Sequence, residues 1–492
     1  MSSSYRQIFK TSALLGGTQV LVILIGMVRS KALALIIGPA GTGFVGLYNS
    51  TSTMISTATG LGIRSSGVRQ IAAAAAVNDD VALANSVVTL RWCVRVTGIL
   101  GGFISLLFCR QLSALTFGTT EYATGVALMS LVLVFEGVSA GQWALLQGLR
   151  KIRELAKARL LGALFGAVAS ISILGVLGEA GIVPFIICAA FFSVLVSWWY
   201  ARQVKIPRVD LSLERFFNEA KLLISLGAAF VVSGLIGCGV AYLSRIIIMR
   251  NFGTVGVGLY GSALALSGLF VGFVLDAMGK DFYPRLTAIA DCDAEVNKLV
   301  NEQTEMVLLL SSSGILAFGV LAPWLLPLFY SGEYLGAVEL LRWQMLGMMF
   351  KVLSWPMGFI QLAKNSRRIF LLTEISFAII SAVALVLSLQ VWGLAGAGIS
   401  VFISYGVHIV INLLFAYKLS KFHWSADCIK TILPISILTT ITFISVMVDK
   451  YSSYIVAIIL VLATVLWCIY RIECLLKINM YKYIVSKICK NV

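Results

Sequence analysis

Residues 41–50 read GTGFVGLYNS, and residues 253–262 read GTVGVGLYGS, with seven identities between the two segments. Two further pairs of segments keep nearly the same spacing along the chain. QGLRKIR from Gln147 matches QLAKNSR from Gln361, and GEAG from Gly178 matches GLAG from Gly393. Three matches in the same order along the chain predict an internal duplication, and in a membrane protein a duplicated, two-lobed chain is typical of a transporter.

The composition identifies the chain as an integral membrane protein. Of its 492 residues 59% are hydrophobic and 12% are charged, and the mean hydropathy is +0.95. Soluble domains carry roughly 25% charged residues. Fourteen apolar stretches approach the length of about 20 residues that crosses a bilayer as a helix. We therefore expect an all-α protein with about fourteen transmembrane helices.

The net charge of +16 could suggest nucleic acid as a partner, but its distribution argues against that interpretation. Lys and Arg collect in alternate loops, as the positive-inside rule requires of a membrane protein. An even number of helices with both termini in the cytoplasm satisfies every loop. The first apolar stretch has no A-x-A cleavage site, so we interpret it as a membrane span and not as a signal peptide.

The duplication fixes the expected domain organisation. The repeats are offset by six helices, and because six is even, both lobes face the same way across the membrane. We expect an N-lobe at residues 1–211 with spans 1–6 and a C-lobe at residues 212–425 with spans 7–12. Residues 426–492 then hold two additional spans and a basic cytoplasmic tail. The repeated GT..VGLY.S motif is expected at the outer loops after spans 1 and 7.

One region resembles a known family. The G-P-A-G-x-G turn at Gly38–Gly43, the GxGI…G…A pattern at Gly60–Ala72 and the QGLRK segment after span 4 are similar to the O-antigen and lipid-linked oligosaccharide flippases. That family, called Wzx or polysaccharide transport, belongs to the MOP exporter superfamily together with the MATE multidrug extruders and the lipid II flippases. The likeness covers the first twelve spans. The two additional spans look more like the lipid II flippases, in which an extra pair shapes a groove for the polyprenyl tail.

The resemblance implies a function in lipopolysaccharide biosynthesis. Its members move undecaprenyl-pyrophosphate-linked repeat units from the inner to the outer leaflet of the bacterial inner membrane, by alternating access through a cationic lumen. Expected partners are that lipid-linked oligosaccharide, membrane lipids, and possible complexes with the polysaccharide polymerase and the chain-length regulator. No cofactor and no nucleic acid are implied.

Cationic residues inside the predicted spans are the candidate substrate-binding residues. Each costs roughly 2.5 to 3.5 kcal/mol to insert, so it is expected to face a cavity or a partner. A guanidinium forms paired hydrogen bonds with phosphate oxygens, which suits a pyrophosphate and acidic sugars. We hypothesise a ladder from the inner mouth to the outer mouth, although the residues near span ends could instead snorkel to the membrane surface. The candidates are Arg29, Lys31, Arg91, Arg95, Arg245, Arg342 and Lys351.

Three acidic residues are candidates for ion coupling or gating. Glu136 lies in the middle of span 4 and could carry a proton or a sodium ion, or it could be a protonated carboxyl bonded to Ser139 or Ser130. Asp276 and Glu374 lie near the inner ends of spans 8 and 11, where pairing with nearby basic residues is the simpler interpretation.

Enzyme functions find little support in the sequence. Asp291-Cys292-Asp293 has the D-x-D spacing of glycosyltransferases, but its loop is too short for a nucleotide-binding domain. His408 and His423 have no metal-ligand spacing, and the nine cysteines form no CxxC motif, so we predict no metal site and no catalytic residues. Three hypotheses stay open. They are a flippase for an oligosaccharide lipid, with lipid II as a possible cargo, a multidrug or cation extruder, and a membrane glycan polymerase or transferase.

Overall fold

The computed structural model describes residues 2–77, 79–204, 206, 213–448 and 451–476. It consists of two compact units. Unit 1 comprises Met1–Gly258 with Phe329–Glu333, and unit 2 comprises Leu259–Leu328 with Tyr334–Val492. The expected boundary at 211/212 and the basic tail beyond residue 476 lie outside the described residues. The lobe limits at residues 211 and 425 stay a prediction.

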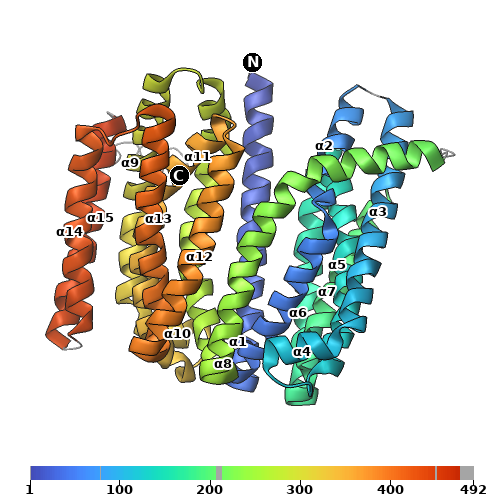
Figure 1. Ribbon diagram of the computed structural model, residues 1–492, viewed down its shortest axis with the longest axis horizontal. Coiled ribbons are helices and arrows are strands. Elements are labelled where there is room, and N and C mark those ends of the chain that lie inside the picture. The colour runs from blue at the N-terminus through green and yellow to red at the C-terminus, as the bar shows by residue number, and fades with distance from the viewer. Residues whose placement is uncertain (1, 78, 205, 207–212, 449–450, 477–492) are drawn as a thin grey trace, which may run out of the picture. The chain divides into compact units, whose positions relative to one another are not determined.

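The described residues are almost entirely helical (Figure 1). Unit 1 contains α1 (Ser2–Gly60), α2 (Ile63–Ala76), α3 (Asp80–Leu107), α4 (Cys109–Phe117), α5 (Ala123–Gly148), α6 (Ile152–Leu177), the short η1 (Gly178–Gly181), α7 (Ile182–Ala201) and the first part of α8 (Leu213–Ala288). Unit 2 contains the rest of α8, α9 (Asp293–Val320), most of α10 (Ala322–Phe329), α11 (Val338–Ala363), α12 (Arg367–Trp392), η3 (Gly393–Ala395), α13 (Gly396–Ser420), α14 (Ala426–Met447) and α15 (Tyr451–Leu476). The short η2 (Gly332–Ala337) lies at the boundary between the two units in the chain.

Ten stretches of the described chain are long and apolar enough to cross a membrane. Four of them are 45 to 58 residues long, about twice the length of a single crossing. Each of the four contains one glycine with positive φ, at Gly38, Gly178, Gly253 or Gly393, and the chain reverses there. Each double-length stretch is therefore two crossings, which confirms the expected all-α fold with fourteen spans.

The two halves of the chain repeat the same backbone breaks. Gly38 and Gly253 have the same separation in sequence as Arg150 and Asn365, and as Gly178 and Gly393. Within each pair the φ angles agree to within a few degrees, for example 56° at Gly178 and 57° at Gly393. The backbone thus repeats with a single register. The GT..VGLY.S motif repeats at a slightly shorter separation, because residues 39–41 lie between the first break and Thr42, whereas Thr254 follows the second break directly.

Each copy of the GT..VGLY.S motif lies at or directly after a tight turn, and most of its residues are helical. Gly38 and Gly253 form the turns, and the motif residues begin the helix that follows each turn. Its glycines allow close packing: a Cβ on Gly43 would meet the Thr254 carbonyl at 2.0 Å, and a Cβ on Gly258 would meet the Pro39 carbonyl at 1.9 Å. Only glycine lets the two helix starts in unit 1 approach so closely.

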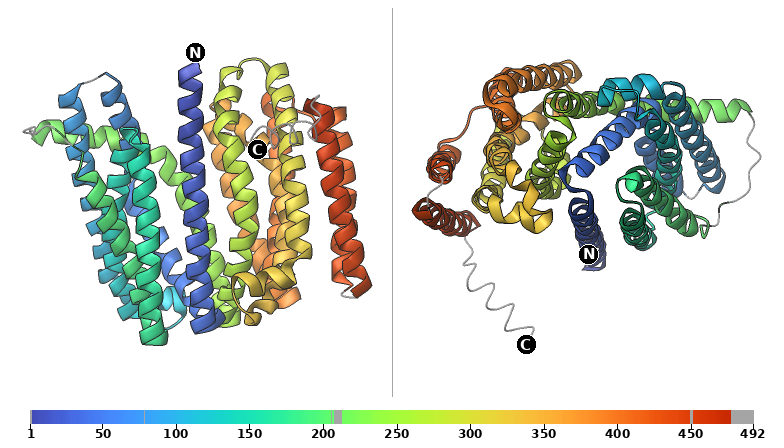
Figure 2. Two further views of the ribbon diagram at one scale, coloured as in Figure 1. Left: turned by 180° about the vertical axis from the view of Figure 1, so that it is seen from behind. Right: turned by 90° about the horizontal axis from the view of Figure 1, so that it is seen from below.

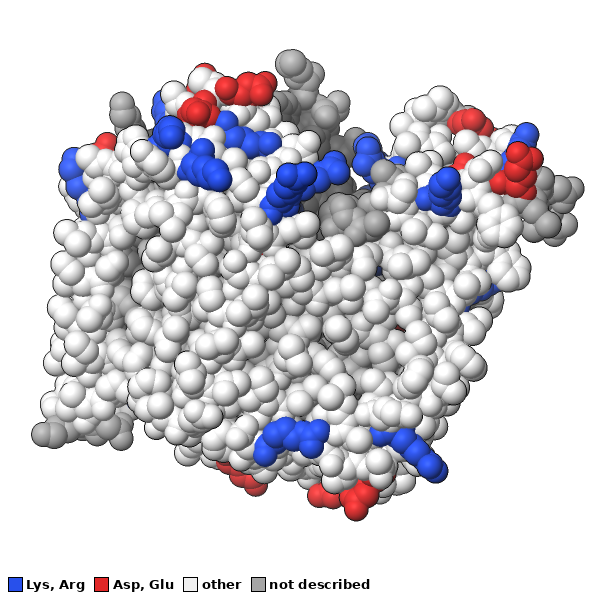
Figure 3. All heavy atoms as spheres, in the orientation of Figure 1, with Lys and Arg blue, Asp and Glu red and all other residues white. Residues whose placement is uncertain are grey.

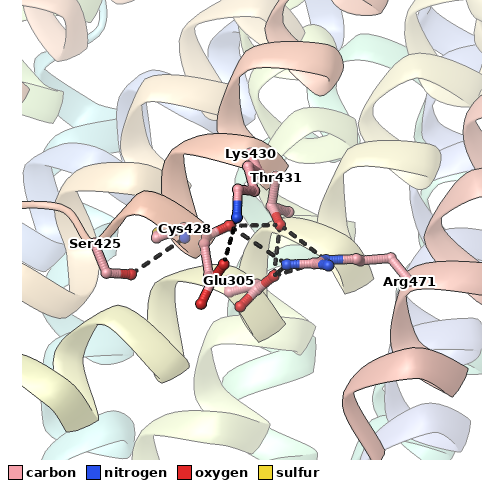
Figure 4. Close-up of polar contacts among 7 residues, drawn as sticks. Glu305, Ser425, Cys428, Lys430, Thr431 and Arg471 are labelled. Atoms are coloured by element: carbon pink, nitrogen blue, oxygen red, sulfur yellow. Dashed lines mark hydrogen bonds and ion pairs between the residues drawn. The ribbon is translucent and has the colours of Figure 1, made fainter.

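The additional pair α14 and α15 belongs to unit 2, and the two helices lie side by side next to α9 (Figure 2). A partly buried ion pair joins α15 to α9. Arg471 of α15 contacts Glu305 of α9 at 3.0 Å, and the Thr431 hydroxyl of α14 donates to the same carboxylate (Figure 4). At a second point Arg342 of α11 donates a hydrogen bond to the Tyr454 hydroxyl of α15. Polar side chains therefore attach α14 and α15 to α9 and α11 at two separate points.

The surface is that of a membrane protein. On the face shown in Figure 3, charged side chains gather at the two ends of the helices, and the band between them is almost uncharged. Large apolar side chains are exposed along the helices, such as Leu35 at 62%, Phe103 at 59% and Val168 at 59%. These side chains are exposed where lipid would cover them.

Candidate functional site in unit 1

Residues of unit 1 line an open cavity of about 800 Å³. Its walls come from α1, α2, α3, α5, α7 and the first part of α8. Both limbs of α1 contribute, because the break at Gly38 folds the helix back and brings Arg29 on the first limb to the same cavity as Asn49 on the second. The volume lies within the range of about 300 to 1,000 Å³ that is common for ligand sites.

Arg29 is the cationic candidate that lines this cavity. Its guanidinium lies 4.2 Å from the centre of the Phe185 ring of α7, a cation–π contact that fixes the side chain against the wall. Its Nε has no hydrogen-bond partner among the described residues. A buried guanidinium has five N–H donors, so Arg29 retains donors for an anionic ligand.

Glu136 of α5 lines the same cavity. Ser139 donates its hydroxyl to the Glu136 backbone carbonyl at 3.1 Å and not to the carboxyl group, so this serine does not satisfy the side chain. Within the described part of the chain, neither Arg29 nor Glu136 forms an ion pair. The cavity therefore holds a cation and an acid that are not neutralised by each other.

Hydroxyl and amide side chains make up much of the remaining wall. Most of them come from the second limb of α1, where the sequence reads NSTSTMISTATG from residue 49. Several donate to carbonyls of their own helix, such as Thr57 to Thr53 at 2.7 Å, and still present their oxygen as an acceptor. The polar neutral residues in the wall are Asn49, Ser52, Thr53, Ser56, Thr57, Thr59, Ser65, Thr97, Ser139 and Ser193.

The cavity wall also carries a second basic side chain, which was not among the candidates from the sequence. Arg64 of α2 and Trp143 of α5 line the cavity, and the Arg64 guanidinium lies 5.4 Å from the centre of the Trp143 ring. The Arg159 guanidinium of α6 lies 5.8 Å from the centre of the same ring. We call these three residues the Trp143 cluster. The run of Ser and Thr within an apolar span was the available sequence signal for the cavity wall.

The other candidates of unit 1 do not line the cavity. Arg91 is half-buried and Arg95 is exposed on α3. Arg245 of α8 donates to the Ala241 carbonyl at 3.1 Å, and Lys31 is half-buried on α1. Their expected role in binding stays a prediction.

The remaining candidates lie in unit 2. The Lys351 ammonium lies 5.6 Å from the centre of the Tyr405 ring, between α11 and α13. Arg342 is only 7% exposed and is bonded to Tyr454, as described above. Asp276 is exposed on α8, and Glu374 is half-buried on α12. No group of three or more His, Cys, Asp and Glu side chains that could hold a metal ion occurs among the described residues.

Solved structures show the same fold. An inward-facing multidrug resistance MATE family transporter of the MOP superfamily superimposes with a TM-score of 0.67 at 18% identity, over 82% of this chain and 95% of that chain. The lipid II flippase MurJ in an inward closed conformation gives 0.64 at 14% identity, over 95% of this chain and all of that chain. The protein therefore has the fold of the MOP superfamily transporters.

Residues 32–339 match the family model described as "Polysaccharide biosynthesis protein". Because that match covers more than half of the chain, the protein belongs to this family. The lipid III flippases of Escherichia coli (strain K12) and Shigella flexneri are similar as well, each 24% identical over 362 residues, covering 71% of this chain and 84% of the relative. The expected superfamily is confirmed.

Proposed function

We propose that this protein is a flippase that moves undecaprenyl-pyrophosphate-linked O-antigen or polysaccharide repeat units from the inner to the outer leaflet of the bacterial inner membrane. The cavity of unit 1 is the observation that carries the proposal. It combines an arginine that retains free donors with a wall rich in hydroxyl groups. The family and the name of the similar lipid III flippases point to the same class of cargo.

The chemistry of the wall matches the two parts of such a cargo. A guanidinium binds phosphate oxygens through paired, charge-assisted hydrogen bonds, so Arg29 is the proposed ligand of the diphosphate. Hydroxyl and amide groups both donate and accept, as sugar hydroxyls do, so the second limb of α1 is the proposed contact surface of the saccharide. The duplicated lobes would alternate access to the two sides of the membrane, as repeated lobes do in other transporters.

Glu136 is the proposed coupling residue. An unpaired carboxyl in a cavity within the membrane span can take up and release a proton as the access of the cavity changes. Both termini are proposed to be cytoplasmic, with the polymerase and the chain-length regulator as partners in the same membrane. The protein is proposed to act as a transporter without catalysing a covalent step.

A flipping assay in proteoliposomes tests the proposal. Vesicles carry a radiolabelled undecaprenyl-diphosphate trisaccharide with a terminal galactose, and galactose oxidase added outside reports the exposed fraction. Wild type should randomise the probe between leaflets, and Arg29→Gln should slow this at least tenfold, since a charge-assisted bond to phosphate is worth about 1.5 to 3 kcal/mol. Arg69→Gln is the matched control, because Arg69 is exposed on α2 and lies outside the cavity wall, and it should flip the probe at the wild-type rate.

Each alternative has its own outcome. If wild type leaves the trisaccharide lipid in place but flips a lipid II analogue, the cargo is lipid II. If it moves neither lipid and instead accumulates ethidium against a gradient, the protein is a cation extruder and the proposal is wrong.

A further inference from the structure

Two arginines share one tryptophan ring at the cavity wall. Arg64 comes from the start of α2, Trp143 from α5 and Arg159 from α6, so three separate helices converge on this ring. Desolvation lowers the pKa of Arg64, and the nearby charge of Arg159 lowers it further. Arg64 is exposed and Arg159 is half-buried, and an anion beside the two groups would offset the repulsion between their charges.

No acid among the described residues provides that anion. Neither Arg64 nor Arg159 forms an ion pair within the described residues. The indole ring attracts each cation through its π face, which holds the pair in place without neutralising it. Since Arg64 and Trp143 both line the cavity, an anionic ligand inside the cavity can reach the cluster.

The cluster lies far from Arg29 along the helices. Arg29 precedes the break at Gly38 by nine residues, about 13 Å at 1.5 Å per residue, and Gly60, next to α2, follows it by 22 residues, about 33 Å. Both limbs leave the break in the same direction (Figure 1), so the two cationic points are roughly 20 Å apart along the bundle. One diphosphate cannot contact both.

The wall between these two points carries the hydroxyl groups of α1, from Ser52 to Thr59. We propose that the Trp143 cluster binds a carboxylate on the saccharide of the cargo, so that this transporter selects repeat units that contain an acidic sugar. This inference rests on the proposed function and adds a second anion site to it. The diphosphate lies at Arg29, the sugar rings follow the hydroxyl groups, and the carboxylate of an acidic sugar ends between Arg64 and Arg159.

A pair of probes that differ only in this carboxylate tests the inference. Both are farnesyl-diphosphate trisaccharides, one ending in glucuronic acid and the other in glucose, and their affinities for the purified full-length protein are measured by thermophoresis. Wild type should bind the glucuronic acid probe at least tenfold more tightly, because a charge-assisted pair is worth about this factor. Arg64→Gln and Arg159→Gln should each remove most of the preference and leave the affinity for the glucose probe unchanged.

Three controls separate the interpretations. Arg29→Gln should weaken both probes by the same factor, since both carry the diphosphate, and Arg69→Gln, at an exposed position of α2 outside the cavity wall, should change neither. Trp143→Phe keeps an aromatic ring and should reduce the preference only partly, which covers the case in which an arginine variant does not fold.

The outcomes distinguish this inference from the proposed function. If wild type binds both probes equally, the acidic-sugar site is wrong and the flippase stands. If Arg64→Gln weakens both probes equally, the cluster is a second phosphate site and the inference is also wrong. If wild type binds neither probe, the proposed function itself fails.

Discussion

Gly38 and Gly253 have the same backbone conformation, with φ 67° and ψ −164° at the first and φ 64° and ψ −168° at the second. This region is accessible essentially only to glycine. Each residue reverses a long apolar segment and so makes two crossings from it. The duplicated fold therefore repeats this glycine turn once in each half, and the first of the two turns brings Arg29 to the cavity.

The first prediction concerns the second of these turns. Gly253→Ala should destabilise the protein by about 1 to 3 kcal/mol, the usual cost of a strained backbone conformation. The strain can be isolated, because a Cβ at Gly253 would meet no atom within 4 Å. Gly261→Ala is the control in the same helix: it is equally open but has no positive φ, and it should be neutral or slightly stabilising. Thermal unfolding in detergent measures both, and equal melting temperatures would contradict the assignment.

The second prediction concerns the attachment of α14 and α15. Glu305 is only 7% exposed, so Arg471→Met should leave a buried carboxylate without its cation and destabilise the protein by a few kcal/mol. The double variant Arg471→Met/Glu305→Leu removes both charges and should recover most of the loss. Two measurements report the effect: thermal unfolding of the intact chain, and the rate of proteolysis between α13 and α14. A single variant as stable as wild type would show that the pair does not hold these helices.

The third prediction concerns Glu136. If its carboxyl carries the coupling proton, wild-type flipping should accelerate when the compartment that receives the cargo is made more acidic. Glu136→Gln stays neutral at every pH, so it should flip at one rate whatever the gradient. Proteoliposomes with an imposed pH difference of two units give the comparison. Full gradient stimulation in Glu136→Gln would show that the proton is carried elsewhere.

The sequence predicted which segments cross the membrane, but it did not predict which neighbours the side chains on those segments contact. Apolar lengths and repeated glycine motifs predicted the crossings and the duplication, because each of these patterns is contained in a short segment of the chain. They did not show that Arg342 bonds to Tyr454, since that partner lies on a helix outside the repeat. Nor did they single out Arg64 and Arg159 as neighbours of Trp143. Which face of a helix a side chain uses is decided by packing between segments distant in sequence.

The fourth prediction concerns Lys351. Its ammonium lies over Tyr405, and a cation–π contact at a partly exposed site is worth only about 0.5 to 1 kcal/mol. Lys351→Met should therefore change the melting temperature little. If the ammonium also contacts the cargo, the same variant should slow flipping at least tenfold, and Lys351→Arg should restore part of the rate by returning the charge. Tyr405→Phe keeps the ring and is the matched control, expected to flip normally. Normal flipping by Lys351→Met would limit this lysine to a packing role and leave unit 1 as the cargo site.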